Sequence, residues 1–272
     1  MTKIFLMPFF VSVSMIGATA AHAGDVRVVC PYVGTINDVC KDESNGIRLK
    51  DNSLLKGVFF LWVNPKRYQW NIFIYQSANI NYSTLWGGHF IFDYYFKAND
   101  RGKYVAGIGA ECLLIDMNAG NHLVPLKDFT MNNNVLAPYA RFGYRFQLNH
   151  GSVDCAVLPW VGAEYQKVWG TLSFVPPGPP MGLGPPIHFN QDIHDESGYA
   201  MAGLNVNATF FHAFEVEGKY YGAFNRHTYL SDASSLVNFY LTKHWGLSYR
   251  LKYMETTQGR DLYNIFGIAF MF

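Results

Sequence analysis

The sequence predicts an all-β chain whose antiparallel strands run up and down and close into a transmembrane β-barrel of about twelve strands, with ten as the alternative. Three observations favour this fold. Aromatic residues make up 17% of the chain and charged residues only 15%, with 22 Phe and 18 Tyr among 272 residues. Apolar and polar residues alternate with a two-residue period from about residue 54 onward. The alternation sets aromatic side chains on one face and charged side chains on the other, which favours aromatics toward lipid and charges toward a lumen.

The first 23 residues have the pattern of an export signal. Lys3 precedes an apolar stretch at residues 4–16, and Ala21, His22 and Ala23 form a small-x-small cleavage site. A membrane anchor is the alternative. Removal of Lys3 makes the basic residues equal in number to the 20 acidic ones. This neutrality argues against a nucleic-acid partner. No later segment reaches the roughly 20 apolar residues of a membrane helix, so any span is made by strands.

Strands are expected along the whole of residues 54–272, which form the predicted barrel. The N-terminal segment 24–53 is expected to hold the first strand, at residues 26–34 or 47–50. The alternation is clearest after Trp245, where Leu247 and Tyr249 oppose Ser248 and Arg250. The remaining strands are expected at residues 54–63, 67–77, 86–97, 103–115, 135–148, 153–173, 198–210, 213–224, 233–243, 245–255 and 261–272.

The expected connections fall into two classes that alternate along the chain. Short ones come at residues 64–66, 98–102, 149–152, 211–212 and 243–244. The others include the two longest gaps and come at residues 78–85, 116–134, 174–197, 225–232 and 256–260. Membrane barrels have short periplasmic turns and longer external loops, so the second class is expected outside the cell.

The last strand carries a family resemblance. Phe266, Ile268, Phe270 and Phe272 form one apolar face, and Phe272 is the final residue. This ending resembles the closing strand of Gram-negative outer-membrane β-barrel proteins, whose terminal aromatic is read by the barrel insertion machinery. The resemblance covers residues 54–272. It implies a porin-like protein of the bacterial outer membrane, in contact with lipid and lipopolysaccharide, with Phe270 and Phe272 as the insertion signal.

The inward faces of the expected strands carry charges of both signs. A buried charge without a partner is costly, so ion pairs and hydrogen bonds across the lumen are expected. Two interpretations remain open: a network that fills and stiffens the barrel, or a water-filled constriction that selects small solutes. The predicted lumen-lining residues are Lys56, His89, Asp93, Glu111, Arg141, Arg145, Glu164, Glu215, Glu217, Lys219, Arg250 and Lys252.

The chain has 4 cysteines, and an exported protein permits disulfides. Cys30 and Cys40 lie in a polar N-terminal stretch and are expected to form a disulfide. Cys112 and Cys155 fall on the lipid-facing side of strands that are two apart. That separation is roughly 9 to 10 Å, so no bridge between them is expected.

The longest expected loop contains two notable segments. Residues 175–186 are rich in Pro and Gly and cannot form a regular strand ladder. Residues 188–196 then bring two His and three acidic residues together, but their spacing matches no metal signature. We assign no metal and no cofactor.

No catalytic residue is assigned. His89 and Asp93 are about 13 Å apart along one strand, too far for the carboxylate to orient the imidazole. The sequence therefore predicts a small passive pore or a structural surface protein. The alternative is a barrel that uses residues 174–197 for adhesion or partner binding. A lipid-modifying enzyme is a third and less favoured interpretation.

Overall fold

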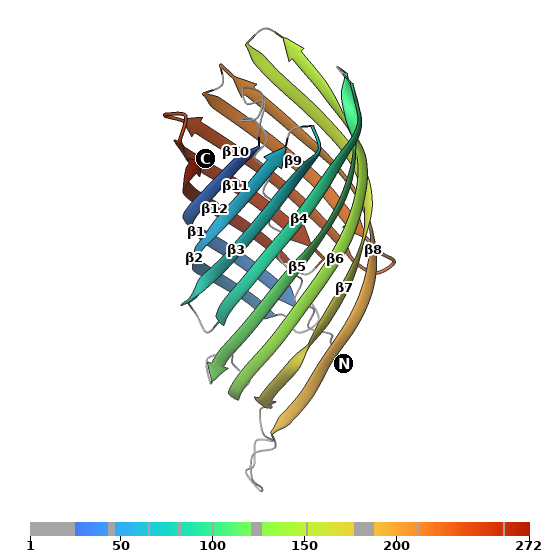
Figure 1. Ribbon diagram of the computed structural model, residues 1–272. Coiled ribbons are helices and arrows are strands. Elements are labelled where there is room, and N and C mark those ends of the chain that lie inside the picture. The colour runs from blue at the N-terminus through green and yellow to red at the C-terminus, as the bar shows by residue number, and fades with distance from the viewer. Residues whose placement is uncertain are drawn as a thin grey trace, which may run out of the picture.

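The computed structural model describes residues 25–42, 47–64, 66–80, 83–99, 101–120, 127–150, 152–176, 188–211, 213–257 and 259–272. Within them, twelve antiparallel strands form a closed barrel, in which each strand pairs with its sequence neighbours and β1 pairs with β12 (Figure 1). The strands are β1 (Val26–Asp42), β2 (Ile47–Asn64), β3 (Tyr68–Ile80), β4 (Ser83–Asn99), β5 (Gly102–Gly120), β6 (Lys127–His150), β7 (Val153–Val175), β8 (Phe189–Phe210), β9 (Phe214–Phe224), β10 (Tyr229–Tyr240), β11 (Trp245–Thr256) and β12 (Gly259–Met271).

The strands differ twofold in length. β9 to β12 have 11 to 13 residues each, close to the roughly 9 to 11 that cross a bilayer. β6, β7 and β8 have 24, 23 and 22 residues. We call β5 to β8 the tall wall, because in Figure 1 these strands extend well beyond the rest of the barrel at one end. About half of the length of β6, β7 and β8 therefore lies outside the membrane-spanning part.

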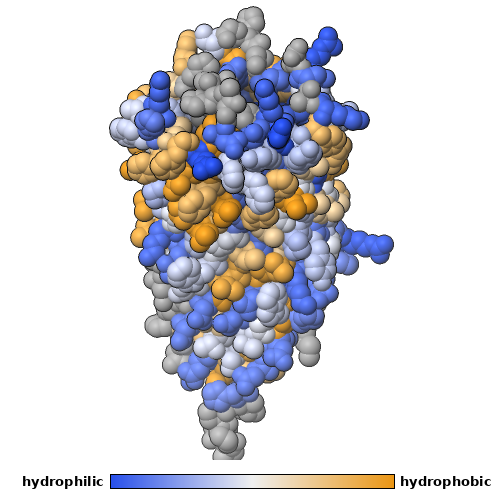
Figure 2. All heavy atoms as spheres, viewed as in Figure 1, coloured by the Kyte–Doolittle hydropathy of each residue, from blue (hydrophilic) through white to orange (hydrophobic). Residues whose placement is uncertain are grey.

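The outer surface carries a belt of apolar side chains. In β2, Phe59 and Leu61 are 2% and 4% exposed, whereas Phe60 and Trp62 between and beyond them are 39% and 40% exposed. This alternation is what a strand with one lipid-facing side produces. Figure 2 shows apolar side chains gathered in the upper part of the visible face and hydrophilic ones prevailing below. The belt therefore marks the part of the barrel that lies in lipid.

The interior is mixed rather than purely polar. One cluster of buried apolar residues joins β1, β2 and β3 to the inner face of the tall wall and includes Phe59, Leu113 and Tyr263. A second cluster includes Tyr139 and Trp160. The expectation that aromatic side chains lie on the lipid side is thus only partly correct, because the barrel also packs aromatic rings inside.

The predicted fold class is confirmed, and the preferred number of strands is correct. The barrel wall begins at Val26 rather than at residue 54, because both candidate segments of the N-terminal region belong to strands, in β1 and β2. The export signal and residues 177–186 of the Pro-rich tract lie outside the described residues. Among the described residues, no helix is long and apolar enough to cross a membrane.

The predicted disulfide is wrong. Cys30 and Cys40 belong to the same strand, β1, and lie ten residues apart. At about 3.3 Å per residue their Cα atoms are roughly 33 Å apart, several times the reach of a disulfide. Cys30 is a free, buried thiol. The strand expected at residues 26–34 continues to Asp42, so both cysteines lie along one strand.

Candidate functional site

An ion pair with two hydrogen bonds joins β4 to β6 inside the barrel. Arg141 donates two hydrogen bonds to Asp93, from Nε to Oδ1 at 3.1 Å and from Nη2 to Oδ2 at 2.6 Å. The two side chains are 6% and 5% exposed. A paired fork of this kind combines charge with fixed geometry. It therefore fixes the positions of β4 and β6 relative to each other across β5.

A glycine on the intervening strand makes this contact possible. Gly107 of β5 lies directly between Asp93 and Arg141 in the ladder. A Cβ atom at Gly107 would collide with the Asp93 carboxylate and with the Arg141 side chain. Gly87 has the same role between β3 and β5, where it leaves room for the Tyr75 ring. The absent side chains let groups from strands that are two apart meet over the sheet.

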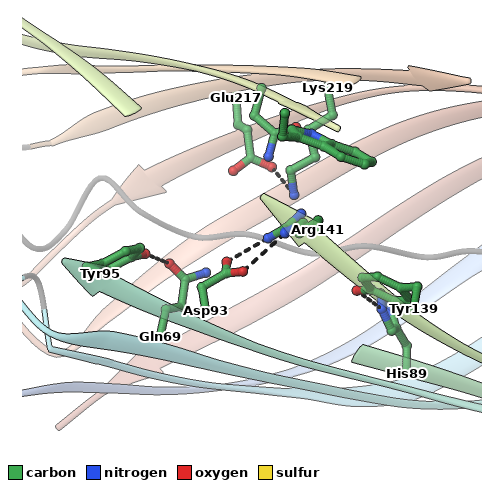
Figure 3. A network of polar contacts seen from close by, with 10 residues as sticks. Gln69, His89, Asp93, Tyr95, Tyr139, Arg141, Glu217 and Lys219 are labelled. Atoms are coloured by element: carbon green, nitrogen blue, oxygen red, sulfur yellow. Dashed lines mark hydrogen bonds and ion pairs between the residues drawn. The ribbon is translucent and has the colours of Figure 1, made fainter. Parts of the chain in front are cut away.

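Two further ion pairs lie in the opposite wall. Lys219 and Glu217 of β9 are 2.8 Å apart, and Lys252 of β11 is 2.8 Å from Asp232 of β10. All four side chains are 3% exposed or less. In Figure 3, Arg141 lies between Asp93 and the Glu217–Lys219 pair, so the pairs from facing walls approach one another inside the barrel.

Glu215 is the acceptor at the centre of a second group. Its carboxylate accepts hydrogen bonds from Asn207 at 2.6 Å, Asn238 at 2.9 Å and Tyr240 at 2.7 Å. These donors come from β8 and β10, the two neighbours of β9. Three donors compensate the loss of hydration of a carboxylate that is 0% exposed.

Neutral groups extend this network. Tyr75 donates to Glu111 at 3.2 Å, and Tyr95 donates to Gln69 at 2.9 Å. His89 and Tyr139 are 3.0 Å apart, and the tautomer of the imidazole decides which of them donates. His89 and Asp93 thus contact Tyr139 and Arg141, not each other, as their separation along β4 requires.

Most of the predicted lumen-lining residues lie inside. Except for Lys56, each of them is at most 8% exposed. The prediction for Lys56 is wrong, because it is exposed and lies opposite Val33, which is 58% exposed on the outer surface. The inner face of β2 is apolar, so the rule that charges point inward fails there. Phe270 and Phe272 lie on the outside, 43% and 77% exposed.

Several members of the network are not evident from the sequence. Asp232 lies one residue before the strand expected at 233–243, although it is the ion-pair partner of Lys252. Tyr75 was not expected inside, because aromatic residues were expected on the lipid side. Asn207 and Asn238 are uncharged, and only their place in the inward alternation could have indicated them.

In the expected external loop 174–197, residues 174–175 belong to β7 and residues 189–197 belong to β8. Residues 166–174 of β7 pair in register with residues 189–197 of β8. On the outer face of this hairpin, Lys167 is 3.2 Å from Glu196, and both side chains are more than 40% exposed. Among the described residues, no group of three or more His, Cys, Asp or Glu side chains is arranged to hold a metal ion.

Comparison with known proteins shows the fold. No protein-family model matches the chain, and no curated protein matches it. The transport unit of the autotransporter AIDA-I from Escherichia coli has a TM-score of 0.56 at 11% identity, over 98% of this chain and 94% of that chain. The translocator domain of the autotransporter NalP from Neisseria meningitidis has a TM-score of 0.55 at 13% identity, over 92% and 90%. The deltaS2S3 mutant of the TodX monoaromatic hydrocarbon channel has 0.51 at 9% identity, over 92% and 90%.

Proposed function

We propose that this outer-membrane β-barrel is a structural surface protein with a closed lumen. Its short strands and filled interior anchor it in the membrane. The tall wall projects from the outer surface and is the part that makes contacts outside the cell. The observation that carries the proposal is the burial of the interior charges: Glu111 and Glu215 are 0% exposed and Lys252 is 1% exposed. Charges that line a water-filled pore keep contact with solvent, because burial of an ion is costly.

The direction of the tall wall follows from the connections. β6 to β7, β8 to β9 and β10 to β11 are joined by short turns at one end of the barrel. The extended ends of β6, β7 and β8 lie at the other end. Short turns face the periplasm in barrels of this class, so the tall wall projects from the outer surface.

Conductance in planar lipid bilayers tests the closed lumen. The wild-type protein is expected to give no discrete steps. The double variant Asp93→Ala with Arg141→Ala removes both members of the ion pair that joins β4 to β6 without leaving a lone charge, and is expected to produce steps. Insertion of both proteins is checked by heat-modifiable gel mobility. Discrete steps from the wild-type protein would contradict the proposal and support a passive pore.

A further inference from the structure

The strand β8 has an edge that no strand covers. β7 pairs with β8 along its whole length, from Phe189 to Phe210. β9 pairs only with the second half, from Ala200 onward. In the described part of the chain, residues 189–199 therefore have a strand on one side only. We call these residues the free edge.

The β9–β10 turn marks the end of the free edge at Tyr199. β9 ends at Phe224, which lies opposite Ala200. Within the turn, Thr228 Oγ1 donates a hydrogen bond to the Tyr199 hydroxyl at 3.4 Å. β9 and β10 thus stop where the extension of β8 begins, and β8 continues past them toward the lower end of the barrel in Figure 1.

Such an edge presents backbone hydrogen-bonding groups to its surroundings. In an antiparallel strand, every second residue directs its N–H and C=O groups away from the paired neighbour. Unpaired groups of this kind are a template for another strand. Within lipid they would be prohibitively costly, so an edge of this length is tolerated because it lies in water beyond the membrane.

The free edge is held in place before any partner binds. Ile193 is partly buried and packs against the first apolar cluster of the interior. Phe189 at the end of the edge contacts Phe174 of β7, with ring centroids 5.1 Å apart. A rigid edge has little conformational freedom to lose on binding, so a partner has to order only itself.

The charges along the free edge select the partner. Asp192, Asp195 and Glu196 are acidic, and Lys167, which pairs with Glu196, lies on the neighbouring strand. Asp192 and Asp195 form no ion pair within the described residues. The edge therefore offers two carboxylates without a counterion in that part of the chain, which favour a strand with Lys or Arg side chains.

Two symmetric registers for a second copy of the chain on this edge bring like charges together. A symmetric antiparallel pairing centred on His194 places Asp192 opposite Glu196 of the other copy. A pairing centred on Asp195 places that residue opposite itself. Like charges directly across two strands are destabilising, so these registers are disfavoured.

We propose that residues 189–199 of β8 bind an extended peptide segment rich in Lys or Arg by strand addition. Backbone hydrogen bonds to the free edge supply the affinity, and Asp192 and Asp195 supply the preference for basic side chains. The inference rests on the proposed surface function only in that the tall wall faces outward. It names the partner class of that wall, and it holds whether or not the lumen conducts.

The test compares two peptides of equal charge on the full-length protein in detergent micelles. The first alternates Lys and Thr over nine residues, and the second replaces every Thr by Pro, which removes N–H donors and the ability to join a ladder. Fluorescence anisotropy is expected to show at least tenfold tighter binding of the Lys–Thr peptide. Asp192→Asn with Asp195→Asn is expected to weaken this binding. Glu255→Gln is the control, because it neutralises a carboxylate at the same end of the barrel. This variant is expected to leave the affinity for the Lys–Thr peptide unchanged.

Equal affinity for the two peptides would show attraction of charge alone and overturn the proposal, as would the absence of saturable binding. Concentration-dependent dimers that the Lys–Thr peptide does not displace would assign the edge to a second copy instead. Conductance steps in bilayers would contradict the closed lumen but leave peptide binding intact, so the two proposals fail separately. Heat-modifiable mobility shows that each variant is folded.

Discussion

The membrane-spanning part of the barrel, which includes β9 to β12, and the part of the tall wall beyond the membrane are built from the same ladder but meet different surroundings. Each short strand is about as long as the membrane is thick, so its outward residues face lipid and its inward residues face the filled interior. β7 and β8 have 23 and 22 residues, so their extensions are expected to lie beyond the membrane with water on their outer face. Polar groups there need no internal partner, because water can hydrate them.

This difference in hydration determines how much an ion pair contributes to the stability of the barrel. The Asp93–Arg141 pair is about 5% exposed, whereas the Lys167–Glu196 pair is more than 40% exposed. Inside the barrel, a charge that loses its partner cannot be hydrated, so removal of either member of the pair is strongly destabilising. On the outer face of the β7–β8 hairpin, either member is hydrated alone, so the pair is free to exchange for another partner.

Breaking the interior pair is expected to have the largest effect. Arg141→Ala leaves Asp93 as a buried charge without its counterion, which costs about 3–5 kcal/mol of unfolding free energy. Urea unfolding in lipid vesicles, followed by Trp fluorescence, measures the loss. Lys167→Ala on the tall wall is the matched control, and a loss equal to that of Arg141→Ala would contradict the distinction between the two regions.

A substitution at Gly107 tests the same comparison through space rather than charge. In Gly107→Val, the new side chain collides with Asp93 and Arg141 and forces them apart, with an expected cost of about 1–3 kcal/mol. At Gly198 in the free edge, an added Cβ atom would have no heavy atom within 4 Å beyond its chain neighbours, so Gly198→Val is the matched control. The same unfolding measurement is expected to show a clear loss for the first variant only. Equal losses would mean that Gly107 is not a spacer.

The same physical contrast explains which strands the sequence predicts well. The strand expected at 213–224 is observed as Phe214–Phe224, and that expected at 245–255 is Trp245–Thr256. In the tall wall, the strand expected at 198–210 begins at Phe189, and that expected at 135–148 begins at Lys127. Alternation of hydropathy requires one apolar and one polar face, and residues 189–197 carry mostly polar side chains on both faces. Their backbone forms a ladder that the side-chain pattern does not show.

For the candidate site, the sequence predicts which residues face inward but not which of them pair. The positions of Asp93, Arg141, Glu217 and Lys219 on inward faces follow from alternation, because each lies in a strand with one apolar face. Their pairing does not follow, since Asp93 and Arg141 meet only because Gly107 leaves the intervening position empty. The free edge was also beyond reach, because it depends on where β9 stops rather than on any residue of β8.

The smallest expected effect concerns Glu196 on the tall wall. Hydrogen bonds from Tyr165 and then Lys167 hold the pKa of the Glu196 carboxyl below its ordinary value of 4.5. A lowered folded-state pKa stabilises the hairpin above about pH 4.5, and this contribution disappears as the pH falls through the lowered pKa. Because Glu196 is well exposed, the effect on overall stability is small.

Removal of the Tyr165 hydroxyl isolates this contribution. In Tyr165→Phe, the pKa of Glu196 is expected to rise toward 4.5, because the first of its hydrogen-bond donors is gone while Lys167 remains. Carbon-detected NMR titration in micelles measures the pKa, with Glu196→Gln to identify the signal. Tyr220→Phe, which removes another exposed hydroxyl from the outer surface, is expected to leave the pKa unchanged. A Glu196 pKa that is the same in Tyr165→Phe as in the wild type would mean that the contacts of this hairpin in water are too weak to perturb a carboxyl.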